Sequence, residues 1–173
     1  MLIFFLTILV ITTIIFNMGS ELQAEIKQTK PFSSLEEEVA LNLQRTAYLL
    51  GLKNIELLKA ADLTPTQYNA LRILRGAGGT GLTCGEISDR LITKDSDITR
   101  LLERLETRKL IVRERDASDR RVIVAKITEA GLQILQELDE PIMKRNKESL
   151  EHLGKDLLEQ LNALLVLARK NVK

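Results

Sequence analysis

The sequence is short of the residues that most catalytic and metal sites require. It has one cysteine, one histidine and no tryptophan among its 173 residues. A single cysteine excludes an intramolecular disulfide framework and any metal site built from several thiolates. A single histidine disfavours a His-rich metal site and a Ser-His-Asp catalytic system. We therefore expect neither a cofactor nor an enzymatic activity.

The sequence also lacks an excess of charge of either sign. Lys and Arg number 25 against 24 for Asp and Glu, which leaves a formal net charge of +1. This balance excludes a globally basic protein that coats nucleic acid, although a local basic face is still allowed. With 45% hydrophobic and 28% charged residues, and only three prolines, the chain is typical of a soluble, helix-rich globular protein.

The first twenty residues contain no charged side chain. Residues 1–16, MLIFFLTILVITTIIF, are apolar apart from three threonines. The run is slightly short for a spanning helix, and it has neither a preceding basic residue nor a small-residue cleavage site. It is a membrane anchor, a signal peptide or an upstream extension from a misplaced start before Met18. We favour the last, with residues 1–17 as an extension of a cytoplasmic protein. The alternative is a membrane-tethered helical interaction protein anchored by residues 1–16.

Helix start signals recur along the rest of the chain. Ser34 precedes a long helix, expected over 34–61, that is apolar on most sides and so predicts a core on one side and another subunit on the other. Thr64-Pro65 begins a second helix. That helix ends in the glycine cluster GAGGTG at 76–81, which fits G-x-G-x-x-G in letters. The nucleotide-binding fingerprint needs a preceding strand, so we interpret the cluster as a loop rather than as a sign of a nucleotide-dependent enzyme.

The centre of the chain has the outline of a helix-turn-helix. Thr83 begins a short helix, with a glutamate at the capping-box position three residues later. A longer helix follows, with one apolar stripe and with Arg100, Arg104 and Arg108 at spacings of four on its flank. Two short helices joined by a brief turn, the second bearing exposed arginine, are typical of DNA-binding proteins.

After residue 110 the residue pattern changes from one typical of helices to one typical of β-strands. Residues 111–115 and 122–127 are rich in β-formers and bracket the polar turn DASDRR, which predicts a β-hairpin with a charged tip. Residues 98–126 hold nine basic and five acidic side chains, a local excess suited to phosphate. Thr128 then begins a helix, Pro141 is expected to kink or divide it, and Gly154 is expected to separate it from a final leucine-rich helix.

Residues 64–131 resemble the winged helix-turn-helix of the multiple-antibiotic-resistance regulator (MarR) family. The resemblance lies in DSDITRLLERLETRKLIVRERDASDRRVIVAKITEAG, above all in its D-x-x-D-R-R tip and the ITEAG helix start. It implies a single domain over 18–173, mainly α with a small β-hairpin wing. Residues 64–127 would form the DNA-binding lobe, and helices 34–61 and 132–170 would form the dimer. The implied function is a homodimeric transcriptional regulator, usually a repressor released by a small ligand, on a pseudo-palindromic double-stranded DNA operator.

The same resemblance implies roles for individual residues. The recognition helix would face the major groove and the wing the minor groove, while Asp116 corresponds to a wing acid that orients an arginine through a salt bridge. Asp95 and Asp97 depart from the basic or neutral residues common in the family, so they either cap the helix or accept a hydrogen bond from a cytosine amino group. The side chains expected to contact DNA are Ser96, Thr99, Arg100, Arg104, Arg120 and Arg121.

Two further sites are expected, a ligand pocket and a cysteine at a helix start. The resemblance implies a ligand pocket between the first two helices and the C-terminal ones, which Tyr48, Leu52 and Tyr68 could line, although plain core residues are the better interpretation of these three. Cys84 begins a short helix, where a helix dipole favours a reactive thiolate, but a packed small residue is the better interpretation. The lone His152 is expected at a surface or interface, because one histidine cannot form a metal site.

Overall fold

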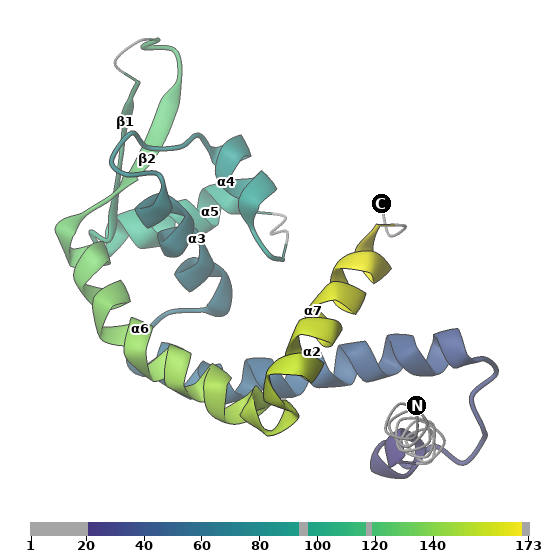
Figure 1. Ribbon diagram of the computed structural model, residues 1–173. Coiled ribbons are helices and arrows are strands. Elements are labelled where there is room, and N and C mark those ends of the chain that lie inside the picture. The colour runs from purple at the N-terminus through teal and green to yellow at the C-terminus, as the bar shows by residue number, and fades with distance from the viewer. Residues whose placement is uncertain (1–20, 94–96, 117–118, 171–173) are drawn as a thin grey trace. The chain divides into compact units, whose positions relative to one another are not determined.

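The computed structural model describes residues 21–93, 97–116 and 119–170 (Figure 1). The chain divides into two compact units, one ending at Gly51 and the other beginning at Leu52. The apolar segment 1–17 lies outside the described residues, and the expected single domain over 18–173 stays a prediction. In chain order the named elements are α2 (Leu35–Ala60), α3 (Pro65–Gly76), α4 (Cys84–Arg90), α5 (Ile98–Thr107), β1 (Ile111–Arg115), β2 (Ile123–Ile127), α6 (Glu129–Leu150), η1 (Glu151–Leu153) and α7 (Gly154–Arg169).

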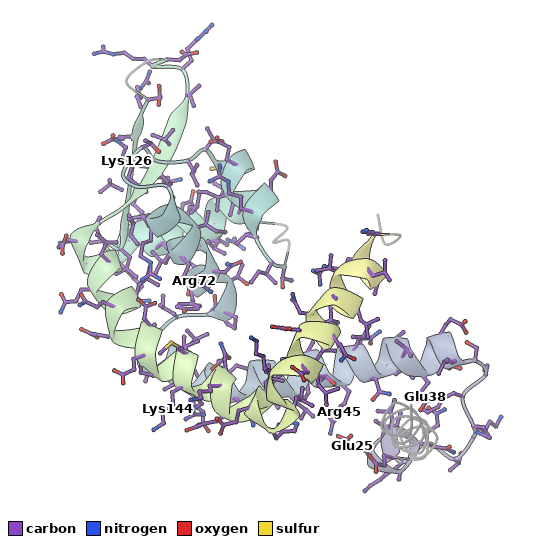
Figure 2. All side chains as sticks on the ribbon, in the orientation of Figure 1. Glu25, Glu38, Arg45, Arg72, Lys126 and Lys144 are labelled. Carbon is purple, nitrogen blue, oxygen red and sulfur yellow. The ribbon has the colours of Figure 1, made fainter. Side chains whose placement is uncertain are left out.

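Helix α2 begins where its cap was expected. The Ser34 hydroxyl accepts the backbone N–H of Glu37 at 3.2 Å. In the N-terminal unit, Arg45 on α2 forms an ion pair with Glu25, with an Nε–Oε1 distance of 2.7 Å (Figure 2). Along the whole of α2 only Leu58 is buried. The broad apolar surface expected to be covered is therefore largely exposed in the single chain.

The C-terminal unit is organised around α3. Its start is a capping box, in which the Gln67 N–H donates to Thr64 Oγ1 at 3.2 Å and the Thr64 N–H donates to Gln67 Oε1 at 2.9 Å. The glycine cluster that follows is a loop, as predicted, and Gly78, Gly79 and Gly81 all have positive φ. It leads from a helix to the isolated bridge at Leu82, so the strand that a nucleotide-binding fingerprint needs does not precede it.

Helices α4 and α5 form the predicted helix-turn-helix. A second capping box begins α4, where the Thr83 N–H donates to Glu86 Oε2 at 2.8 Å and the Glu86 N–H donates to Thr83 Oγ1 at 3.2 Å. The Asp97 carboxylate caps α5 by accepting the N–H of Arg100 at 3.0 Å. Of the two alternatives open for Asp97, the helix cap is therefore seen. Asp95 lies outside the described part of the chain.

The predicted hairpin is an antiparallel pair of strands. Its register places Ile111 opposite Ile127 and Arg115 opposite Ile123. Leu82 adds an isolated antiparallel bridge to Ala125, so the glycine loop is tied to the hairpin. Figure 1 shows the two strands extending away from the helices of the lobe.

The C-terminal helices follow the sequence expectations in part. The Thr128 hydroxyl accepts the N–H of Gly131 at 3.2 Å and so caps α6. Pro141 does not divide α6, which runs through it to Leu150. Gly154, with a φ of +69°, does separate the short helix η1 from α7. A residue with positive φ costs least when it is glycine, which explains the break at this position.

One hydrophobic core joins α3 to α6, α4, α5 and β2. The apolar stripe of α5 points into it as expected, with Leu101, Leu102 and Leu105 buried. Each such side chain contributes about 1.5 to 3 kcal/mol by leaving water. In the described ranges, no helix is both long and apolar enough to cross a membrane. The largest fully buried side chains are Leu71, Leu74, Ile87, Leu102, Leu105, Ile111 and Leu135.

Candidate nucleic-acid interface

Helix α5 has one buried face and one exposed face. Opposite its core leucines, Thr99, Arg100 and Arg104 are exposed. Arg100 lies 3.7 Å from Asp97, measured from Nε to Oδ2, and its side chain keeps 69% of its surface exposed. The cap that starts the helix thus also holds a loose ion pair with the first arginine on the exposed face. Ser96 lies outside the described residues.

The three arginines expected along one flank of α5 do not share one environment. Arg108, the last of them, turns back toward the end of α2. Its guanidinium donates to the carbonyl oxygens of Ala61, at 3.1 Å, and of Asp62. A cation at a helix C-terminus is stabilised by the exposed carbonyls and the helix dipole. Arg108 therefore fastens α5 to the turn after α2 and leaves Arg100 and Arg104 as the exposed pair.

Carboxylates of α5 and of the hairpin neutralise part of the positive charge of this region. Arg113 forms an ion pair with Glu106 on α5, with an Nη2–Oε2 distance of 2.6 Å. Lys126 pairs across the strands with Glu114 at 2.6 Å, from Nζ to Oε1. Hydrogen bonds from the Arg113 side chain hold the pKa of Glu106 below its ordinary value. The charge excess of the sequence is therefore concentrated at fewer positions than its nine basic residues indicate.

The wing tip carries two arginines in different settings. Arg121 forms two hydrogen bonds with the Asp119 carboxylate, Nε to Oδ1 and Nη2 to Oδ2, each at 3.0 Å. Those bonds hold the pKa of Asp119 below its ordinary value. Asp116, the expected wing acid, accepts the backbone N–H of Asp119 at 3.1 Å. Arg120 is exposed, and its carbonyl accepts a hydrogen bond from Arg115 at 3.1 Å.

The expected ligand-pocket residues differ in burial. Tyr48 is 58% exposed and Leu52 is 40% exposed. Tyr68 is half-buried and packs against the core, with Arg72 lying 5.7 Å from its ring centroid. Burial raises the pKa of the Tyr68 phenol. A pocket formed by these three residues stays a prediction.

The lone cysteine is half-buried in the helix-turn-helix, and the lone histidine is exposed. Cys84 is half-buried against the core at the first residue of α4, as expected of a packed small residue. His152 is exposed in η1. Within the described ranges, no group of three or more His, Cys, Asp or Glu side chains could hold a metal ion.

Sequence reasoning missed two features of this lobe. One is Asp119 as the carboxylate that holds Arg121, although both residues belong to the tip motif. The other is an open cavity of about 540 Å³ between the end of α2, the start of α3 and α5. Of the residues lining it, only Arg104 was among the expected site residues. No spacing rule relates the lining residues of 59–67 to those of 104–108, because these two segments are brought together only by the packing of the helices.

Comparison with known proteins agrees with this geometry. The model of the MarR family matches residues 61–122, which include α3, the helix-turn-helix and the tip of the wing. The HTH-type transcriptional regulator MhqR of Bacillus subtilis (strain 168) is 28% identical over 64% of this chain and 75% of its own length. The HTH-type transcriptional repressor IacR of Pseudomonas putida is 30% identical over 70% of this chain and 72% of its own.

A solved structure extends the similarity beyond the lobe. The crystal structure of a MarR transcription factor from Planctomyces limnophilus is 38% identical, with a TM-score of 0.60, and the match covers 79% of this chain and 98% of that one. That coverage is larger than the winged helix-turn-helix lobe of residues 64–127 alone. The chain therefore belongs to the MarR family of helix-turn-helix transcriptional regulators, which are DNA-binding proteins and not enzymes.

Proposed function

We propose that this chain is a homodimeric, sequence-specific repressor that a small ligand releases from DNA. The observation that carries the proposal is the two-sided α5, whose leucines fix it in the core while Thr99, Arg100 and Arg104 stay exposed beside the hairpin. An α-helix fits the major groove of B-DNA, and a hairpin tip reaches the adjacent minor groove. We assign base contacts to α5 and minor-groove contacts to Arg120 and Arg121.

The exposed apolar surface supports a dimer. Helix α7 buries no residue in the single chain, and Leu157, Leu161 and Leu164 are 49%, 38% and 62% exposed. Spacings of four and three place these leucines on one side of the helix. Apolar faces of this kind mark protein–protein contacts. A twofold dimer would present two copies of α5 to two half-sites, which is why we expect a pseudo-palindromic operator.

Similarity to the transcriptional repressor IacR supports repression as the role of this chain. The pocket expected at Tyr48, Leu52 and Tyr68 supports release from DNA by a small ligand. A repressor covers its operator until a ligand favours a conformation that binds DNA less well. The ligand needs a different affinity for the two conformations, since equal affinity shifts no population.

Footprinting of the full chain on the DNA upstream of its own gene tests the proposal. We expect two protected half-sites whose centres lie about 10 base pairs apart, or a multiple of that, as one helical turn requires. The control is the double variant Arg100→Ala, Arg120→Ala, which keeps the core and should leave the same DNA unprotected. Equal protection by this variant and by the wild-type chain would contradict the assignment of α5 and the wing as the DNA-binding surface.

A further inference from the structure

The cavity beside α5 has a lining suited to an anion. It is open, has a volume of about 540 Å³, and lies wholly within the unit that begins at Leu52. Leu63, which is 4% exposed, provides an apolar surface. Lys59 comes from the last turn of α2, Arg104 from α5, and Arg108 from the residue that follows α5. Three cations from two segments of the chain therefore surround one cavity.

These cations are only partly neutralised. The one carboxylate of the lining is Asp62, which lies 3.6 Å from Arg108 and keeps 90% of its side chain exposed. The Arg108 guanidinium also donates hydrogen bonds to the backbone carbonyls of Ala61 and Asp62, just after α2. By contrast, Lys59 and Arg104 have no carboxylate partner in the part of the chain that the structure describes. The cavity thus keeps two cations available for a bound group.

The Gln67 side chain supplies a further donor. Gln67 is the one buried polar residue among those described, with 8% of its surface exposed, and it lines the cavity. Its Oε1 accepts the N–H of Thr64 in the capping box. Its Nε2 has no hydrogen-bond acceptor among the described residues. This Nε2 is not a buried donor lacking a partner, so it is open to water and can donate to a bound acceptor.

We propose that this cavity binds the phosphate group of a small phosphorylated compound. A phosphate monoester carries up to two negative charges and several strong acceptor oxygens, which match two available cations and the Gln67 amide. The start of α3 adds the positive end of a helix dipole. A monocarboxylate would satisfy fewer of these groups. The site is distinct from the expected pocket at Tyr48, Leu52 and Tyr68, because none of those residues lines it.

Arg104 links the site to DNA, an inference that rests on the proposed function. The same guanidinium lines the cavity and belongs to the exposed face of α5. A phosphate bound in the cavity would draw it away from the DNA backbone. Occupancy of the site should therefore weaken operator binding, and operator binding should weaken occupancy by the same factor.

The test measures binding of phenyl phosphate and benzoate to the full chain by calorimetry without DNA. Gln67→Glu keeps the acceptor of the capping box, and glutamate is equally suited to that position, but it replaces the free amide with a negative charge. Lys59→Gln removes one cation. Lys53→Gln is the matched control, because it removes the same charge from the same helix outside the cavity. Circular dichroism melts of all three variants verify folding.

We expect the wild-type chain and Lys53→Gln to bind phenyl phosphate more tightly than benzoate. Gln67→Glu and Lys59→Gln should each weaken phenyl phosphate at least about tenfold, as loss of a charged hydrogen bond does. Equal affinity for the two probes, or unchanged affinity in both variants, would overturn the proposal. Titration of the same variants with operator DNA identifies a third outcome. If both lose DNA affinity without phenyl phosphate present, the cavity contacts the DNA backbone and the proposal also fails. Because calorimetry uses no DNA, failure to bind phenyl phosphate leaves the proposed DNA binding untouched.

Discussion

The guanidinium of Arg121 forms a bidentate ion pair with the carboxylate of Asp119, with both N–O distances at 3.0 Å. Asp119 is itself held, because its backbone N–H donates to Asp116. Arg120 has no corresponding carboxylate among the described residues. The two neighbouring arginines of the wing are therefore not equivalent, since one is oriented by an acid and the other extends freely.

Replacement of Arg100 by alanine should reduce the discrimination between operator and mutated operator DNA. An arginine at a base edge contributes about 1 to 3 kcal/mol and sets the preference at one position. We expect Arg100→Ala to lower operator affinity and to reduce the difference between operator and mutated operator. Fluorescence anisotropy titrations on both DNAs measure this, with Arg169→Ala at the end of α7 as the control. Retention of full discrimination at lower affinity would make Arg100 a phosphate contact.

Replacement of a wing arginine should act differently. Arg120→Ala or Arg121→Ala is expected to lower affinity for all sequences and to reduce the slope of log affinity against log salt by about one per lost contact. Each subunit contributes one wing, so a dimer loses two contacts. Titrations at several salt concentrations provide the measurement. Selectivity should change only in A·T-rich flanks, where a narrow minor groove attracts arginine. Unchanged slopes in both variants would remove the wing from the interface.

A charge on the apolar side of α7 should dissociate the proposed dimer. Leu164 is 62% exposed in the single chain, so Leu164→Glu costs little in a monomer but buries a carboxylate in an interface. We expect sedimentation equilibrium to show monomers or unfolded chains for Leu164→Glu at concentrations where the wild type is dimeric. Ala163→Glu adds the same charge to an exposed position on another side of α7 and should stay dimeric. A folded wild-type monomer at micromolar concentration would contradict the prediction.

The ion pair between Arg75 on α3 and Asp139 on α6 should make stability depend on pH. The N–O distances are 2.7 and 3.0 Å, and these hydrogen bonds hold the pKa of Asp139 below its ordinary value. A lowered pKa in the folded state stabilises the protein above the ordinary carboxyl pKa, and this contribution is lost as pH falls through the lowered value. Both side chains are about a third or more exposed, so about 0.5 to 1 kcal/mol is expected.

Denaturant unfolding of Asp139→Asn from pH 3 to pH 7 measures this contribution. The variant should be less stable than the wild type at neutral pH, and the difference should shrink toward zero in acid. Glu140→Gln is the control, because the neighbouring Glu140 has no ion pair in the described ranges. A difference that is independent of pH would show that the ion pair is not its source.

Two glycines should respond in opposite directions to alanine. A Cβ on Gly131 would collide with the carbonyl oxygen of Leu110 and lie 2.7 Å from Cγ1 of Ile127. Gly131→Ala should therefore lower the free energy of unfolding by about 1 to 3 kcal/mol. A Cβ on Gly85 would meet nothing closer than 4.0 Å, so Gly85→Ala in α4 should raise it by about 0.5 to 1 kcal/mol. Urea unfolding of both variants compares them, and a stable Gly131→Ala would mean that α6 shifts freely on the hairpin.

Local chemistry made much of this fold readable from the sequence. Thr64, Thr83 and Thr128 each accept a backbone N–H from three residues later, so the signal and its partner lie within one turn. The stripe of α5 and the strands of the hairpin were likewise predicted, because periodicity reports which face is buried. The resemblance to the MarR family rested on this same continuous stretch.

Contacts between distant segments were decided only by the tertiary structure. Arg108 looked like a third flank arginine, yet it donates to carbonyls 46 and 47 residues earlier. Lys59 and Gln67 have no spacing relation to Arg104, and only the packing of α3 against α5 brings the three around one cavity. By itself the sequence determined where helices and strands begin, because caps and apolar periods act over a few residues. The tertiary structure decided which cations stay available for a ligand, because an arginine or lysine is neutralised by whatever partner the fold places beside it.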